Sequence, residues 1–246
     1  MAEQHPTPSS SDAASFAATR WSVVLAAARG AVSARADEAM AELCRVYWFP
    51  LYAYVRRRGC ETSEAEDLTQ EFFARLLAKN YLASVTPEKG KFRAFLLASL
   101  KHFLANEWDR SRAQKRGGGR RPLSLDALNA EDRYRLEPSH NLTAERLYER
   151  HWALTLLERI LGRLEMEWTV HGKKPLFDSL KSTLTGSAEA GYAATGEELG
   201  MTEAAVKVAA HRLRRRYREL LREEIAQTVA RPEEIDEEIR YLLACL

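Results

Sequence analysis

The stretch TEAAVKVAAHRLRRRYRELLREE, residues 202–224, decides the fold because it combines an apolar stripe with a dense basic run. Its apolar residues recur at spacings of three and four, which is the pattern of a helix with one face buried in a core. These residues are Val206, Ala210, Leu213, Tyr217 and Leu220. The other faces carry His211 and a run of lysine and arginine: Lys207, Arg212, Arg214, Arg215, Arg216, Arg218 and Arg222. Such a run is either an ordinary solvated face or a surface for an acidic partner.

The residues before this helix favour the second of these interpretations, in which the basic face binds an acidic partner. Residues 192–199 predict a short helix, Gly200 predicts its C-cap, and Thr202 predicts the N-cap of the basic helix. Two helices joined by a tight glycine turn form a helix-turn-helix, whose second helix lies in the major groove of DNA. Its first turns would face base edges with Lys207, Val208, His211 and Arg212, and its later turns would reach phosphates with Arg214, Arg215 and Arg218.

The composition sets limits on the class of protein. A chain of 246 residues can form one large or two small domains. Its 37 basic and 35 acidic residues nearly cancel, so only local segregation of charge can signal nucleic-acid binding. The cysteines Cys44, Cys60 and Cys245 are far apart and odd in number, which argues against a disulfide framework or a zinc site. The pattern of a signal peptide is missing and no apolar run is long enough to span a bilayer, so we expect a cytoplasmic protein that does not bind membranes.

The order of segments predicts an all-α fold of two helical domains joined by a flexible linker, the second domain containing the helix-turn-helix. Pro50 is expected to kink or split the helix around it. The expected segments are a disordered N-terminus at 1–18, a helical domain at 19–116, a linker at 117–143, the helix-turn-helix domain at 144–230 and an acidic amphipathic tail at 231–246.

One acidic stretch carries a family resemblance. The sequence EDLTQEFFARLL, residues 66–77, resembles the D-L-x-Q-E-x-F signature of bacterial RNA polymerase sigma factors, in the short extracytoplasmic-function (ECF) group of the sigma-seventy family. In that family the helix docks on the clamp of the largest polymerase subunit. The resemblance therefore implies that the polymerase-binding residues are Asp67, Leu68, Gln70, Glu71 and Phe73.

A second stretch strengthens the resemblance. In KFRAFLLASLKHFLANEWDRSRAQKR, residues 91–116, the start resembles the F-R-x-W-L pattern of the promoter-melting helix of these factors. The pattern is met at Phe92, Arg93, Phe95 and Leu96. The resemblance implies that unstacked bases of the minus-10 element are contacted by this helix, with the loop 83–90 as a possible base pocket. The implied residues are Lys101, His102, Asn106, Arg110 and Arg112. The helix-turn-helix would then read the minus-35 element.

The resemblance implies a promoter-specificity subunit that is not an enzyme and needs no metal or other cofactor. Its implied partners are core RNA polymerase, through the clamp and flap, and promoter DNA, with an anti-sigma factor or other regulator as a further candidate. Residues 19–26 and 231–246 also resemble sigma factors abundant in planctomycetes. The chain departs from the family at Thr195 and Gly196, and because glycine inside a helix costs about 1 kcal/mol against alanine, we expect the first helix of the motif to be loosely held.

Other functions fit parts of the sequence. A free-standing helix-turn-helix regulator would bind duplex DNA without polymerase, and a helical adaptor would bind acidic proteins with its basic faces. No glycine-rich phosphate loop, H-E-x-x-H or G-x-S-x-G motif supports an enzyme. The tail at 231–246 is expected either to cap the core of the second domain or to fold back and mask basic residues.

Overall fold

The computed structural model describes residues 34–78, 86, 90–113, 125–135, 142–184 and 191–246. All regular elements within these ranges are helices, which confirms the all-α prediction. Residues 1–33, including the expected disordered N-terminus, lie outside the described part. None of the described helices is long and apolar enough to cross a membrane.

The first lobe consists of α2 (Ala34–Arg57), α3 (Thr62–Ala78) and α4 (Phe92–Ala113). Aromatic rings from the three helices meet in its core: the ring centroids of Phe72 and Phe103 lie 5.8 Å apart, and those of Tyr47 and Phe92 lie 5.6 Å apart. α2 continues through Pro50 as a single helix, so the proline does not split it.

The second lobe is built on α6 (Ala144–Val170), followed by α7 (Lys174–Leu180), the 3₁₀ turn η3 (Lys181–Leu184), α8 (Tyr192–Leu199) and α9 (Glu203–Ala226). A 3₁₀ turn, η4 (Pro232–Glu234), then leads to the C-terminal helix α10 (Ile235–Ala244). α9 runs antiparallel to α6, because Glu167 pairs with Arg216 at 2.8 Å and the earlier Arg163 pairs with the later Glu223 at 3.0 Å.

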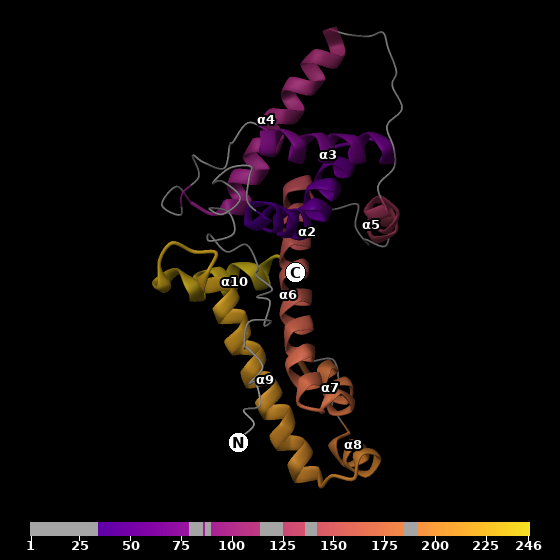
Figure 1. The fold of residues 1–246 in the computed structure, drawn as a ribbon, viewed down its shortest axis with the longest axis vertical. Helices are drawn as coiled ribbons and strands as arrows, with labels where there is room; N and C mark the ends of the chain where they lie inside the picture. Colours follow the sequence, from indigo (N-terminus) through magenta and orange to yellow (C-terminus); the bar gives the residue numbers. More distant parts are fainter. Residues whose placement is uncertain (1–33, 79–85, 87–89, 114–124, 136–141, 185–190) are drawn as a thin grey trace, which may run out of the picture.

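α6 belongs to both lobes. Its first half packs against α2, where Tyr148 and Trp152 are fully buried and the His151 ring meets the Phe49 ring edge-on at 4.6 Å. Its second half packs against α7 and α9. Figure 1 shows α6 running from the first lobe down to α7 and α8. The buried residues of the two lobes form one continuous hydrophobic cluster, so the lobes meet along this helix as well as through the chain between them.

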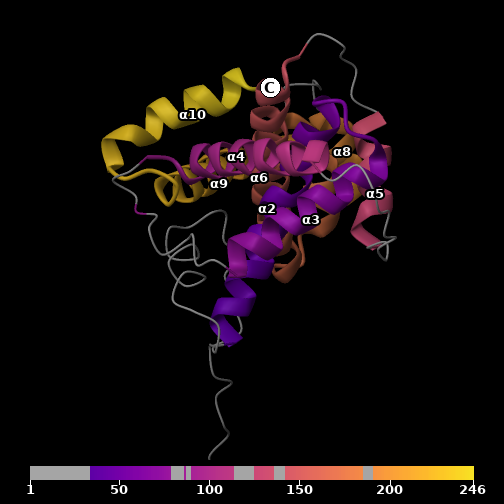
Figure 2. The same ribbon diagram turned by 90° about the horizontal axis from the view of Figure 1, so that it is seen from above.

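The segment 117–143, expected to be a flexible linker, contains α5 (Leu125–Arg135). Glu131 binds α5 to α2: its carboxylate accepts hydrogen bonds from Tyr52 at 2.6 Å and from Arg56 at 3.0 Å. The Arg133 guanidinium also lies 4.2 Å from the centre of the Phe49 ring. Seen from above, α5 and α10 lie on opposite sides of the first lobe (Figure 2). The sequence pattern missed this helix because partners far away in the chain stabilise it.

The turn between α8 and α9 has the caps that the sequence predicts. Gly200 ends α8 in the left-handed conformation, with φ of +65°, and the Thr202 side chain accepts a hydrogen bond from the backbone N–H of Ala205. The expectation that Gly196 loosens the motif is wrong. A Cβ atom at this position would lie 2.6 Å from the carbonyl oxygen of Met201, so only glycine lets the turn approach α8 this closely.

We therefore predict that Gly196→Ala destabilises the protein by about 1–3 kcal/mol, because backbone must shift to admit the methyl group. Gly162→Ala is the matched control. It lies inside α6 with nothing within 4 Å of an added Cβ, so it should stabilise the protein by about 0.5–1 kcal/mol. Urea denaturation of both variants gives the comparison, and equal stabilisation by the two substitutions would contradict the tight turn.

The Glu131 contact predicts a pH-dependent contribution to stability. Burial raises the pKa of this carboxyl group, but hydrogen bonds from Arg56 and Tyr52 outweigh burial and hold the pKa below its usual value. The contribution is therefore present above the unfolded-state pKa of about 4.3 and is lost as pH falls through the lower folded-state pKa. Glu131→Gln should cost about 1–2 kcal/mol of unfolding free energy at neutral pH. The difference from the unmodified protein should shrink toward pH 3 in urea titrations, whereas a constant difference would contradict this account.

Candidate nucleic-acid and protein interfaces

α3 presents an acidic face to solvent. Asp67 is exposed, and Gln70 and Glu71 are partly exposed on the same side of the helix. Arg75 holds this helix to α4, because it pairs with Glu71 at 2.9 Å and with Glu107 of α4 at 2.8 Å. A rigid helix with an exposed carboxylate and amide can bind a basic protein surface.

The five residues of the predicted polymerase-binding signature have different surroundings. Phe73 is only 5% exposed and its ring contacts that of Phe72, while Leu68 is partly buried against the core. The prediction that Phe73 contacts a partner therefore needs correction: it supports the helix from inside. Asp67, Gln70 and Glu71 remain the surface part of the signature.

The residues predicted to contact DNA from α4 also differ in their exposure and in their partners. His102 and Asn106 are exposed and lie one helical turn apart. Lys101 instead pairs with Glu145 of α6 at 2.8 Å, and the hydrogen bond to this carboxylate raises the pKa of the lysine. Arg110 is exposed and pairs with Glu107 at 3.0 Å. The side chain of Arg112 and most of the loop 83–90 lie outside the described residues.

The start of α4 holds a residue whose role the sequence pattern did not reveal. Arg93 is 4% exposed; its guanidinium pairs with Glu149 of α6 at 3.0 Å and with Glu238 of α10. It also lies 4.3 Å from the Trp152 ring centre. The sequence FRAFLL does indicate that Arg93 is buried. Residues three and four positions after it, on the same face of the helix, are the core residues Leu96 and Leu97. An arginine on such a face needs buried partners.

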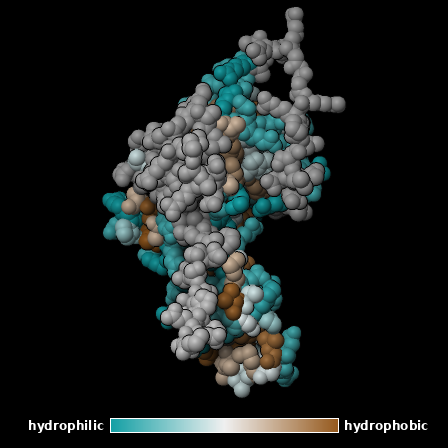
Figure 3. All heavy atoms as spheres, viewed as in Figure 1, coloured by the Kyte–Doolittle hydropathy of each residue, from teal (hydrophilic) through white to brown (hydrophobic). Residues whose placement is uncertain are grey.

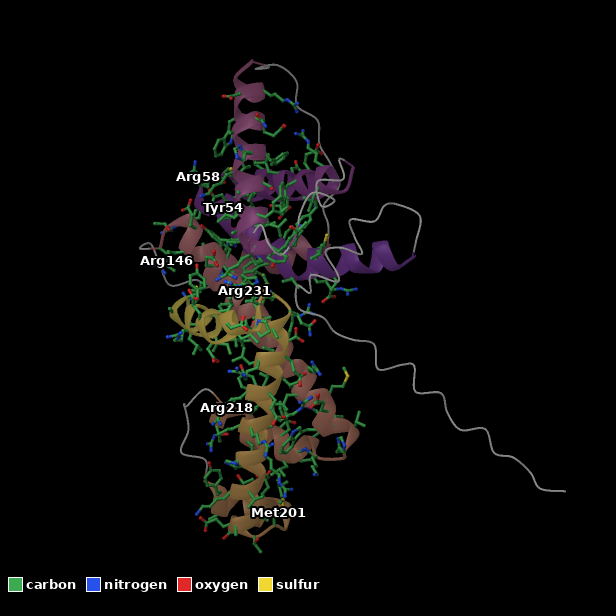
Figure 4. The ribbon with its side chains drawn as sticks, turned by 90° about the vertical axis from the view of Figure 1, so that its left-hand side faces the viewer. Tyr54, Arg58, Arg146, Met201, Arg218 and Arg231 are labelled. Carbon is green, nitrogen blue, oxygen red and sulfur yellow. The ribbon has the colours of Figure 1, made fainter. Side chains whose placement is uncertain are left out.

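On α9, one face carries most of the predicted DNA contacts. Val208, His211 and Arg212 are exposed, and Val208 has half of its surface accessible. Lys207 and Arg215 are also exposed, each with a glutamate four residues away at 2.6 and 2.9 Å. Figure 4 shows Arg218 on α9, between Met201 at the turn and Arg231 near α10. The coloured surface in the view of Figure 3 is mostly hydrophilic, with apolar atoms in several small patches.

Two arginines of the basic run face the protein instead. Arg214 donates hydrogen bonds to the Tyr192 hydroxyl at 3.1 Å and to the Thr183 carbonyl at 3.4 Å, which ties α9 to α8 and η3. Its predicted contact with phosphate needs correction, because these bonds turn its guanidinium inward. Arg216 pairs with Glu167 of α6 at 2.8 Å, and the hydrogen bonds raise the pKa of this arginine.

Comparison with known proteins identifies one segment. Residues 49–114 match the family described as Sigma-70 region 2, which spans the end of α2, all of α3 and α4. This match supports a sigma factor of the sigma-70 family, a family of non-catalytic transcription initiation factors that recognise promoters together with RNA polymerase. No curated protein and no solved structure matches the chain.

The division of the basic run gives a prediction with two readouts. Arg214→Ala should lower the free energy of unfolding by about 1–2 kcal/mol, because it removes the bonds to Tyr192 and Thr183. Arg218→Ala should change stability by less than about 0.5 kcal/mol. It should instead weaken duplex DNA binding and reduce the slope of log affinity against log salt by about 0.9, the loss of one phosphate contact. Urea denaturation and salt titrations measure both effects, and a large stability loss with Arg218→Ala would refute this division.

Proposed function

We propose that the chain is a promoter-specificity subunit of the ECF group that binds core RNA polymerase, reads the minus-35 and minus-10 elements and helps to melt the latter. The observation that carries this proposal is that the Sigma-70 region 2 match contains both the exposed acidic face of α3 and the exposed face of α4. A free-standing regulator would need neither.

Each interface has a separate task in this proposal. Asp67, Gln70 and Glu71 dock on the clamp of the largest polymerase subunit. The exposed His102 and Asn106 favour unstacked bases of the minus-10 strand, which allows binding energy to offset the few kcal/mol that unstacking costs.

The second lobe supplies duplex recognition. Val208, His211 and Arg212 lie on the outer face of α9 near its start, where a recognition helix contacts base edges. Lys207 lies on the same face and belongs to the proposed base-edge set, while Arg215 and Arg218 on the later turns are the proposed phosphate contacts. In this proposal, the helix-turn-helix lobe also contacts the polymerase flap, the protein works in the cytoplasm, and an anti-sigma factor is a candidate regulator.

The clamp assignment predicts that Asp67→Ala combined with Gln70→Ala lowers affinity for core polymerase about tenfold or more, because these side chains become desolvated in the complex. Glu71 is left unchanged because it holds Arg75 in place. Glu158→Ala removes an exposed carboxylate of α6 and serves as the charge-matched control. Polymerase affinity is measured by fluorescence anisotropy, and run-off transcription on a promoter library is measured in parallel.

The outcomes separate the candidate functions. Promoter-specific transcription that the double variant loses, with unchanged thermal unfolding, supports the sigma-factor proposal. Sequence-specific duplex binding without any dependence on polymerase would favour a free-standing regulator. Binding that shows no dependence on salt would exclude the DNA interface altogether.

A further inference from the structure

One edge of the exposed face of α4 lies against α2 and α6. His102 and Asn106 are in the middle of this face. Lys101, at its edge, pairs with Glu145 of α6 at 2.8 Å, and its ammonium lies 6.0 Å from the centre of the Tyr54 ring of α2. The surroundings of this edge therefore come from three helices that are far apart in sequence.

A second cation lies about two helical turns further along the same edge. The guanidinium of Arg58, the residue that follows α2, lies 5.5 Å from the centre of the Trp108 ring. Trp108 and Lys101 lie on the same side of α4 and about 10 Å apart along it, at 1.5 Å per residue. The Lys101 hydrogen bond is the main cause that lowers the pKa of Glu145, and the charge of Arg58 adds to it. Both cations thus act on one carboxylate.

Arg146 extends this row of cations onto α6. It directly follows Glu145 and its side chain is exposed. The start of α6 is fixed in place, because Arg57 of α2 donates a hydrogen bond to the Leu142 carbonyl at 2.9 Å and the Thr143 side chain accepts one from the Arg146 backbone N–H at 3.2 Å. The first half of α6 also packs against α2. Arg146 is therefore held at a constant place on the first lobe.

Arg58 and Arg146, the flank arginines, have charges that the described part of the protein does not neutralise. Both are exposed, and neither forms an ion pair with another described residue. Figure 4 shows them on the same side of the first lobe as Tyr54. Between them, the charge of Lys101 is balanced by that of Glu145. This edge of α4 therefore keeps two positive charges whose planar guanidinium groups match the geometry of a phosphate.

The cations are arranged for one strand of nucleic acid. The opposite edge of the face carries Arg110, which pairs with Glu107 at 3.0 Å, so the unpaired cations lie on one side only. The path of about 10 Å along α4 spans about three phosphates of a single strand, at 3.4 Å each. Proteins that bind single strands combine a positive track for the backbone with a surface for the bases. Here the bases would lie over His102 and Asn106.

We propose that Arg58 and Arg146 form a phosphate track for one unpaired strand, whose bases lie over the exposed face of α4. That this strand belongs to the minus-10 element rests on the proposed function, whereas the affinity of the track for single-stranded nucleic acid does not. The track supplies affinity without base specificity. Because it holds the strand in its unpaired form, it also offsets part of the few kcal/mol that unstacking costs.

The track is tested by the salt dependence of binding to a fluorescent oligothymidylate of about 20 nucleotides, measured by anisotropy. Each phosphate contact with a single strand adds ~0.7 to the slope of log affinity against log salt. Arg58→Ala and Arg146→Ala should therefore each reduce the slope by about 0.7, with a loss of affinity of about fivefold at low salt that vanishes at high salt. Arg58→Lys and Arg146→Lys keep the charge and should keep the slope.

Arg45→Ala is the matched control. It removes an exposed arginine from α2, about 20 Å along the helix from Arg58, and should leave the slope unchanged. The same titrations are repeated with the protein bound to core polymerase, on oligonucleotides of different sequence. The flank variants should weaken all sequences equally, whereas His102→Ala should change the preference among sequences.

Three results would overturn the track. One is an equal slope for the flank variants and Arg45→Ala when the thermal unfolding of all variants is unchanged. Another is a loss of affinity that depends on base sequence. The third is the absence of salt-dependent binding to a single strand by the unmodified protein, both alone and with core polymerase. Salt-dependent binding without promoter-specific transcription would instead refute the proposed function and leave the track in place.

Discussion

The buried guanidinium of Arg93 is the constraint on which the arrangement of the helices depends. A cation with 4% of its surface exposed must be surrounded by acceptors, and these come from Glu149 on α6 and Glu238 on α10. The backbone carbonyl of the same residue accepts a hydrogen bond from the Tyr148 hydroxyl at 3.0 Å. Because these bonds fix the buried side of α4, they also fix the direction in which His102 and Asn106 face solvent.

The lysines and arginines in the basic run of α9 fall into two groups, one exposed to solvent and one bound to other helices. Lysines and arginines on one face remain in solvent, where their charges can attract DNA, while Arg214 and Arg216 hold α9 to α8 and α6. Arginine side chains therefore hold α9 in position, and other arginines of the same helix are expected to bind DNA. This arrangement explains how a chain with nearly balanced charge can present a locally basic surface.

The sequence predicted best what is determined by neighbouring residues. The all-α fold, the C-cap at Gly200 and the N-cap at Thr202 follow from local spacing and side-chain chemistry, and the structure confirms them. The site was predicted only in part. Phe73 and Arg214 turn inward, Gly196 is required by a close contact with Met201, and α5 forms on α2 through Glu131. Arg214 and α5 depend on partners brought close only by folding, and Gly196 depends on the exact geometry of a turn; periodicity reveals neither.

The central claim is that the exposed acidic face of α3 and the exposed face of α4 belong to a promoter-specificity subunit that works with RNA polymerase. The most direct test is run-off transcription by core polymerase on a promoter library, with the unmodified protein compared with the variant that combines Asp67→Ala and Gln70→Ala. The account predicts transcription from a discrete set of promoters that the double variant loses while its thermal unfolding stays unchanged. Equal transcription by both proteins, or none above that of core polymerase alone, would contradict it.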